Sequence, residues 1–319
     1  MEERLLALLR LALKHNATDI HFSLRYSEIT IEMRVDGRLL KVKSRPQDEK
    51  LIRYLQYLAN LDVGKNINKP QTGGFEFYVD DTLLSLRFAI ITSVNSSQGV
   101  LRILNSKLKV DGMHLSKIEE QNEILKKAIK ADNGLILFSG KTGSGKTTTL
   151  YSLLKQVAHK KIYTIEDPIE VFDDRFMQLQ INHESNLTYE QYIAQVLRHD
   201  PDIIMIGEIR DAKAARMAVV AANTGHLVLS TIHASSAGGI ISRMSEFGIR
   251  EDHLYEVLIL LSNQKMVMDN NNKKCVLYEL MDREEINYYR KNKHNSNFFL
   301  SVGKQYNEGV KNGTIKPED

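Results

Sequence analysis

The segment from Gly140 to Thr147 has the residue types and spacing of a loop that binds phosphate groups. It fits the pattern GxxxxGK[ST] at every fixed position, with an apolar run before it and a helix-forming stretch after it. Glycines let consecutive backbone N–H groups surround phosphate oxygens, and the helix N-terminus adds partial positive charge. The pattern predicts a nucleotide site whose binding residues are Gly140, Thr142, Gly143, Ser144, Gly145, Lys146, Thr147 and Thr148.

Two side chains of this loop have distinct expected roles. Lys146 should bridge the β- and γ-phosphates, and the Thr147 hydroxyl should bind Mg²⁺. Lys141 is expected to be only a solvated charge of the loop. A chance glycine-rich turn is the alternative, and it is disfavoured because the strand and the helix are both in place.

A glutamate follows the apolar run Ile203–Ile206. Strands of this kind commonly end in an aspartate that serves Mg²⁺, but Gly207 stands there and Glu208 comes next. We therefore expect Glu208 to be the ligand of Mg²⁺ or of a Mg²⁺-bound water. The alternative is a surface glutamate that opens the next loop, which the preceding apolar run disfavours.

A second acidic cluster follows the apolar run Ile162–Ile165 and contains Glu166, Asp167 and Glu170. The ends of parallel strands form the ligand crevice of an α/β sheet, so these acids could face the nucleotide. Hydrolysis needs a carboxylate that orients or deprotonates water near the γ-phosphate. Asp167 before a proline equally suits a simple turn, and spacing alone leaves both interpretations open.

Histidines and arginines lie near the same runs. His226 and His233 bracket the run Leu227–Ser230, and a histidine at a strand end is more often structural than catalytic. Arg198 and Arg210 flank the Ile203 run, and each could be a surface ion-pair partner or a phosphate contact. The sequence does not decide between these roles.

Residues 106–319 alternate short apolar strands with helices. Continuous apolar runs are typical of parallel strands buried on both faces. The expected strands are Leu135–Phe138, Ile162–Ile165, Ile203–Ile206 and Leu227–Leu229, and the expected helices are 146–158, 189–199 and 211–223. Asp211 should cap the last of these helices. An Asn-rich loop should join a hairpin of 265–268 and 275–280. The alternation predicts a doubly wound α/β domain.

Residues 1–105 have a different rhythm, typical of a small α+β domain. Helices are expected at 2–14 and 49–61, and Asp36-Gly37 should turn a hairpin after the strand Ile29–Val35. Further strands are expected near Phe75–Tyr78, Leu83–Ile90 and Val100–Leu104. Residues 105–116 have the composition of a linker.

Composition excludes several classes of protein. The 43 Lys and Arg nearly balance 40 Asp and Glu, a net charge of +3 that does not favour a dedicated nucleic-acid binder. Cys275 is the only cysteine, so no internal disulfide can form and no zinc site is expected. The N-terminus lacks a signal sequence, and no apolar run approaches the ~20 residues that span a bilayer. We therefore expect a cytosolic protein.

Four motifs occur in the order found in the secretion ATPase superfamily, which drives type II secretion, type IV pili and competence pseudopili. They resemble its Walker A, Asp box, Walker B and His box motifs, and they are Gly140–Thr147, Ile165–Glu170, Gly207–Asp211 and Thr224–His233. The segments Ala17–His21, Val35–Arg38 and Pro70–Gly73 are similar to motifs of its N-terminal domain. The resemblance implies an α/β fold, with a RecA-like ATPase domain and C-terminal helical region at 106–319 after a PAS-like α+β domain at 1–105.

The resemblance also implies roles for individual residues. Glu170 matches the catalytic glutamate of the Asp box, with Glu166 and Asp167 as support. His226 and His233 match a histidine pair believed to contact phosphates. Arg87 and Arg102 match N-domain arginines used around the nucleotide, often across domains or subunits, where they would offset charge that develops during phosphoryl transfer.

The compact build and Pro70–Gly73 look most like the competence pseudopilus branch. That branch implies an ATP- and Mg²⁺-dependent ring motor, a homo-hexamer on the cytoplasmic face of the cell membrane beside an integral-membrane platform protein. It implies DNA uptake without direct nucleic-acid binding. The alternatives are a pilus retraction ATPase, a nucleic-acid translocase or helicase, and a nucleotide-dependent scaffold that does not hydrolyse ATP. An absence of Trp and 7% aromatic residues disfavour the helicase, and Glu170 with Glu208 disfavours the scaffold.

Overall fold

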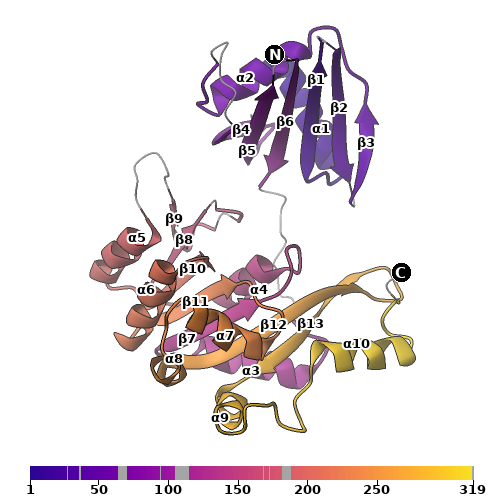
Figure 1. Ribbon diagram of the computed structural model, residues 1–319. Helices are drawn as coiled ribbons and strands as arrows, with labels where there is room; N and C mark the ends of the chain where they lie inside the picture. Colours follow the sequence, from indigo (N-terminus) through magenta and orange to yellow (C-terminus); the bar gives the residue numbers. More distant parts are fainter. Residues whose placement is uncertain are drawn as a thin grey trace. The chain divides into compact units, whose positions relative to one another are not determined.

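A computed structural model of the chain describes residues 1–26, 28–35, 37–63, 70–93, 95–104, 115–167, 169–171, 173–181 and 188–317 (Figure 1). The chain divides into two compact units, Met1–Leu108 and Lys109–Asp319. The predicted boundary at 105/106 and most of the predicted linker lie outside the described residues. Each unit is described below by itself.

The N-terminal unit is a six-stranded antiparallel sheet with the strand order β3-β2-β1-β6-β5-β4. Helices α1 and α2 pack their apolar residues on one face of it, so the core contains Leu5, Leu9 and Leu55 together with Phe22 and Phe88. Its elements are α1 (Glu2–Lys14), β1 (Asp19–Arg25), β2 (Glu28–Val35), β3 (Arg38–Val42), α2 (Glu49–Leu58), β4 (Gln71–Val79), β5 (Thr82–Ser93) and β6 (Ser96–Ile103).

The predicted helices and hairpin of this unit are confirmed, with small changes at the ends. Strands β2 and β3 pair in antiparallel register from Ile31 with Val42 to Val35 with Arg38. Helix α2 ends at Leu58, three residues earlier than predicted. Strand β1 was not predicted, although it is the strand at the centre that pairs with both β2 and β6.

The C-terminal unit is a seven-stranded sheet with the order β13-β12-β7-β11-β10-β8-β9, in which all neighbours from β12 to β9 are parallel. The predicted doubly wound α/β domain is confirmed. Its strands are β7 (Gly134–Ser139), β8 (Ile162–Glu166), β9 (Met177–Gln180), β10 (Ile203–Ile209), β11 (Leu227–Ile232), β12 (Leu258–Met268) and β13 (Lys274–Met281). Its helices are α3 (Glu119–Ile129), α4 (Lys146–Leu154), α5 (Tyr189–Val196), α6 (Ala212–Asn223), α7 (Ala237–Glu246), α8 (Glu251–Val257), α9 (Arg283–Asn292) and α10 (Val302–Lys311).

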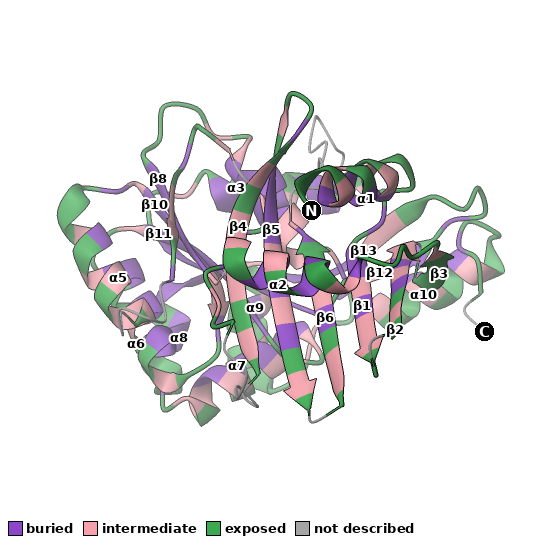
Figure 2. Cartoon of the chain, turned by 90° about the horizontal axis from the view of Figure 1, so that it is seen from above, coloured by how far each residue is buried: buried purple, intermediate pink, exposed green. Residues whose placement is uncertain are grey.

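Alternate residues of the central strands enter two cores on opposite faces of the sheet. Leu135 and Leu137 of β7 belong to the core that includes residues of α5 to α8, and Ile136 and Phe138 belong to the core that includes residues of α3 and α4. These strands are therefore apolar over most of their length, with polar residues towards their carboxyl ends, as expected of parallel strands buried on both faces. Figure 2 shows buried residues along β10 and β11, whereas the strands of the first sheet alternate in exposure.

Local capping explains several boundaries in this unit. The Asp211 side chain accepts a hydrogen bond from the backbone N–H of Ala214, so the predicted cap of α6 is confirmed. Helix α4 ends at Leu154, earlier than the predicted 158. The predicted helix 189–199 is α5 followed by one 3₁₀ turn, Leu197–His199. The predicted hairpin is the pair β12 and β13.

A buried polar network joins distant parts of the C-terminal unit behind the phosphate loop. The amides of Gln121 and Gln305 donate to the carbonyl oxygen of Tyr278 at 2.8 and 2.6 Å. The Tyr278 hydroxyl lies 2.9 Å from the Thr149 hydroxyl of α4. The Ser116 hydroxyl donates to Gln121 at 2.6 Å. Because each polar group has a partner, hydrogen bonds within the network offset the cost of removing these groups from water.

Candidate nucleotide site

The loop between β7 and α4 has the backbone shape of a phosphate cradle. Gly143 has φ +80° and open space where a Cβ would lie, and Gly145 has φ +87° at the N-cap of α4. A Cβ on Gly140 would stand 2.4 Å from the carbonyl oxygen of Gln264 on β12. Glycine is therefore required at 140 for close packing and at 143 and 145 for backbone conformation. The loop lies at the carboxyl end of β7, where parallel α/β sheets bind ligands.

Lys146 is the first residue of α4, and its ammonium group donates to the carbonyl oxygens of Gly140 and Lys141 at 2.8 and 3.2 Å. Burial lowers the pKa of Lys146, and the nearby carboxylates of Glu208 and Glu170 partly oppose that shift. Lys146 follows β7, Glu170 follows β8 and Glu208 lies near the end of β10, so all three are at the carboxyl edge of one parallel sheet. These three charges come from the ends of three different strands.

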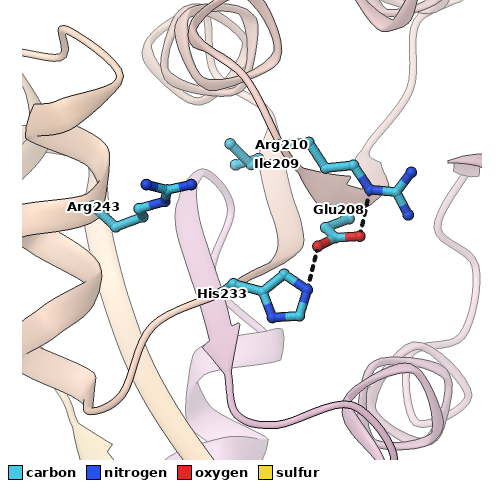
Figure 3. A pocket seen from close by; sticks show the side chains of 5 residues that line it. All are labelled: Glu208, Ile209, Arg210, His233 and Arg243. Atoms are coloured by element: carbon cyan, nitrogen blue, oxygen red, sulfur yellow. Dashed lines mark hydrogen bonds and ion pairs between the residues drawn. The ribbon is translucent and has the colours of Figure 1, made fainter.

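Glu208 lies between the side chains of His233 and Arg210 near the end of β10. Its Oε1 is 2.8 Å from Nε2 of His233, and its Oε2 accepts a hydrogen bond from Nε of Arg210 at 2.6 Å. Figure 3 shows the two partners on either side of the carboxylate, with Arg243 of α7 further away. A cavity of about 310 Å³ is lined by these four side chains and by Ile209. The arrangement orients the Glu208 carboxylate at the strand end.

Glu166, the last residue of β8, is 2% exposed. The hydroxyls of Tyr151 and Thr164 donate to its Oε1 at 2.6 and 2.7 Å. Burial raises the pKa of Glu166, although these hydrogen bonds oppose the shift. Glu170, four residues further on, is exposed. The structure therefore gives Glu166 a buried supporting position and leaves Glu170 open to solvent on the side of Lys146.

The two predicted histidines lie at opposite ends of β11. His233 follows the carboxyl end of the strand and contacts Glu208, whereas His226 precedes its amino end. Nδ1 of His226 lies 3.2 Å from both the Thr224 hydroxyl and the Ala221 carbonyl oxygen. At ~3.3 Å per residue the strand separates the two histidines by roughly 20 Å. The structure brings only His233 to the region of Lys146 within one chain.

The predicted arginines Arg87 and Arg102 belong to the N-terminal unit. They are directly opposite each other on β5 and β6, and Asp19 of β1 is the next residue in the same row. Arg102 donates to Asp19 at 2.8 Å. Burial alone would raise the pKa of Asp19, but hydrogen bonds from Arg102 and Thr18 bring that pKa below its usual value. Arg102 therefore neutralises a carboxylate of its own unit.

The oxygen donors near the loop fit a magnesium ion. Thr147 offers a hydroxyl in the first turn of α4, and Glu208 offers a carboxylate whose oxygens keep further lone pairs beside His233 and Arg210. Mg²⁺ prefers such hard oxygen ligands and retains several waters. Among the residues that the structure describes, no group of three or more His, Cys, Asp and Glu side chains gathers as a metal site. Cys275 is a free thiol on β13.

Several residues near the loop were not identified from the sequence. Gln264 of β12 donates to the carbonyl oxygen of Ser144 at 2.7 Å. The Ser144 hydroxyl and Oε1 of Gln264 are buried without a hydrogen-bond partner. Such orphaned groups beside a ligand loop are consistent with partners that arrive with a ligand. Arg210, which the sequence left undecided, also lies 3.5 Å from Asp167. None of the helices in the described ranges is long and apolar enough to cross a membrane.

Comparison with known proteins gives a consistent relationship. The family profile described as "Type II/IV secretion system protein" matches residues 1–303. The Competence protein ComGA of Bacillus subtilis is 37% identical over 256 residues, covering 79% of this chain and 72% of that protein. ComGA of Halalkalibacterium halodurans is 38% identical over 276 residues, covering 85% and 78%. The resemblance predicted from the motifs is confirmed.

A solved structure of the pilus retraction motor PilT with bound ADP has a similar fold. It is 24% identical with a TM-score of 0.74, and the match covers 98% of this chain and 94% of that one. At this level of identity the likeness concerns the fold. It supports the predicted order of a small α+β unit followed by a RecA-like P-loop unit.

Proposed function

The chain belongs to the Type II/IV secretion system protein family, and we propose that within it the chain is an ATP-hydrolysing motor. One observation carries the proposal: the phosphate loop with Lys146, the segment of Glu170, and Glu208 lie at the carboxyl ends of β7, β8 and β10, which are parallel strands of one sheet. A cation that binds phosphate beside two carboxylates is the arrangement that phosphoryl transfer to water requires. ATP is therefore the proposed substrate.

Each residue has a defined part in the proposed reaction. Backbone N–H groups of residues 140–148 and the Lys146 ammonium group hold the β- and γ-phosphates. Glu170 orients the attacking water and accepts its proton. Mg²⁺, held by the Thr147 hydroxyl and by Glu208 directly or through water, would neutralise phosphate charge. His233 and Arg210 keep the Glu208 carboxylate oriented, and Glu166 supports the Glu170 segment from the buried end of β8.

The finer proposal concerns the machine that this motor drives. Two relatives that are 37% and 38% identical to this chain over 256 and 276 residues are named competence proteins. On that ground the chain assembles a competence pseudopilus for DNA uptake, without itself binding nucleic acid. It works as a homo-hexamer that acts on an integral-membrane platform protein from the cytoplasmic side. Arg87, Arg102 and His226 act in that ring by contacting nucleotide across domains or subunits, which a single chain does not display.

The test is ATP turnover by the purified chain beside Glu170→Gln, with the mass of the protein measured in the same solution. Loss of charge at constant size should lower kcat by about 10²- to 10⁴-fold and leave ATP binding intact. Glu190→Gln on α5 is the matched control, because Glu190 is a half-exposed partner of Lys213 and should leave kcat unchanged. Normal turnover by Glu170→Gln would contradict its proposed role.

Two further arms separate the competing functions. Single- and double-stranded DNA should leave turnover unchanged, and strong stimulation by either would instead favour a nucleic-acid translocase. A mass of six chains with ATP would support the ring. ATP binding without turnover, even with the membrane partner supplied, would favour a scaffold.

A further inference from the structure

Strand β9 presents different side chains to its two sides, although it has only four residues. Met177 and Leu179 line an apolar cavity of about 490 Å³ together with residues of β8, α5 and the following 3₁₀ turn. Gln178 and Gln180 alternate with them, and both contact the segment that carries Glu170. The alternation of a strand therefore divides β9 into a packing side and a side that holds the acidic segment.

Both N–H donors and the carbonyl oxygen of the Gln178 amide are hydrogen bonded near Glu170. Its Nε2 donates to the carbonyl oxygen of Val171 at 2.7 Å and to the Tyr151 hydroxyl at 2.7 Å. Its Oε1 accepts from the backbone N–H of Asp173 at 2.8 Å. On the other side of Glu170, the backbone N–H of Ile169 donates to Gln180 at 3.4 Å. Both neighbours of Glu170 are thus bonded to β9.

Tyr151 extends this connection to the phosphate loop. It lies on α4, which begins with Lys146, and its hydroxyl accepts from Gln178 while it donates to Glu166 at 2.6 Å. Tyr151 is fully buried, and its ring also contacts Phe176 with centroids 5.9 Å apart. Gln178 consequently bonds at the same time to the helix that holds phosphate and to the segment that holds the water-orienting carboxylate.

We propose that Gln178, with Tyr151 as its anchor, is a positioning residue that fixes Glu170 relative to the phosphate loop. The proposal rests on the proposed function of Glu170 in hydrolysis. Gln178 does not touch the reacting atoms, and it acts through the backbone of Val171 and Asp173. Its loss should therefore affect the hydrolytic step and leave ATP binding intact, because the glycines and Lys146 keep their own contacts.

The decisive variants are Gln178→Leu, which keeps the volume and removes all three hydrogen bonds, and Tyr151→Phe, which keeps the ring and removes the anchor. Misplacement of a catalytic group by about 1 Å costs up to about a hundredfold in rate, so Gln178→Leu should lower kcat by roughly tenfold to a hundredfold. Tyr151→Phe loses one anchor and should lower kcat about fivefold. In both, the KM for ATP and the affinity for a fluorescent ATP analogue should stay within about twofold.

Leu179→Ala is the matched control, because it damages the packing side of the same strand. It should lower the melting temperature and keep kcat near that of the wild type. A fall of kcat in Leu179→Ala equal to that in Gln178→Leu would show that only the stability of β9 matters, and would overturn the proposal. Unchanged kcat in both Gln178→Leu and Tyr151→Phe, or a raised KM at constant kcat, would also overturn it.

A double variant distinguishes this inference from the role of Glu170 itself. In single-turnover measurements, adding Gln178→Leu to Glu170→Gln should cause no further loss, because Gln178 acts through Glu170. Independent, multiplied losses would overturn the positioning role and leave the function of Glu170 standing. Full turnover by Glu170→Gln with a defect in Gln178→Leu would overturn the inference together with the assignment of Glu170.

Discussion

Two carboxylates of the N-terminal unit and two charged groups of the C-terminal unit have opposite kinds of hydrogen-bond partner. In the N-terminal unit, Asp19 is paired with Arg102, and the buried Asp48 accepts two hydrogen bonds from Arg4 at 2.9 and 2.8 Å. In the C-terminal unit, the buried Glu166 accepts from uncharged hydroxyls, and Lys146 donates to carbonyl oxygens. The pKa of Asp19 is accordingly lowered, whereas the pKa of Glu166 is raised.

The difference separates charges that stabilise a fold from charges that are kept for a ligand. Arg4 and Arg102 each satisfy a carboxylate of their own unit, so their removal should be measured as lost stability, in addition to the part proposed for Arg102 in the ring. Lys146 sits in a partly buried position where its charge is disfavoured, and the phosphates of ATP would supply the compensation. Residues of active sites commonly carry such an energetic cost. The following variants test the distinction, beginning with the largest effect.

Lys146→Ala should abolish turnover, by at least about 10³-fold, and should weaken ATP binding, because the only side-chain cation of the loop's fixed positions is lost. Its melting temperature without nucleotide should not fall. Lys141→Ala, an exposed charge in the same loop, is the control and should retain turnover. A large loss of stability in Lys146→Ala without nucleotide would break the distinction between the two units.

Arg4→Met should lower the free energy of unfolding by about 3 kcal/mol, because it leaves Asp48 buried at 1% exposure without its cation. Urea denaturation followed by circular dichroism would measure the change. Arg10→Met on the same helix is the matched control. Arg10 pairs with Asp80 where both side chains are more than half exposed, so its removal should not change stability measurably.

Arg102→Ala should cost about 1 kcal/mol at pH 7, discounted because the Arg102 side chain is 62% exposed. The lowered pKa of Asp19 gives this loss a defined pH dependence. The contribution is present above the unfolded pKa of about 3.9 and is lost as pH falls through the lower folded pKa. Unfolding curves of wild type and variant should therefore converge towards pH 3, and a gap independent of pH would contradict the ion pair as its source.

Glu166→Gln should have the smallest effect on the free energy of unfolding. The pH dependence of that effect should be opposite in direction to that of Arg102→Ala. The folded pKa of Glu166 is raised, so the folded wild type binds more protons between the unfolded pKa of about 4.3 and the folded one. Its stability relative to the variant should fall as pH rises through that window, by roughly 1 kcal/mol or less. Denaturation of both proteins from pH 4 to 8 would measure it. If the wild type instead became more stable relative to the variant as pH rises, the folded protein would favour the charged form of Glu166, as it does for Asp19.

The sequence was sufficient for the elements with strong local signals. The apolar runs of β7, β8, β10 and β11 are buried on both faces, and such strands can be recognised from continuous hydrophobicity. The phosphate loop combines a fixed pattern with a strand and a helix, and its glycines have the expected positive φ values. These features depend on neighbours in the sequence, so they could be predicted.

Features that depend on distant neighbours could not be predicted in the same way. Strand β9 has only four residues, and its alternation of Met177, Gln178, Leu179 and Gln180 is too short a signal to recognise. The contact of Gln264 with the phosphate loop joins residues 120 positions apart. The resemblance gave His226 and His233 a common role with phosphates, but β11 separates them and only His233 lies beside Glu208. The sequence therefore predicts which residues belong to a site more readily than it predicts how far apart they lie.

The polar network around Tyr278 sets an order for folding while the chain is being synthesised. In the N-terminal unit the ion pair of Asp19 and Arg102 joins residues 83 positions apart, and all of its strands precede residue 108. Gln121, by contrast, cannot form its hydrogen bonds until Tyr278, 157 residues later, and then Gln305 have been synthesised. Domains generally fold as units, the N-terminal one first. The first sheet can thus be complete on the ribosome while the helix of the phosphate loop still lacks its contact with Tyr278, so the C-terminal unit is the later of the two to bury its polar network.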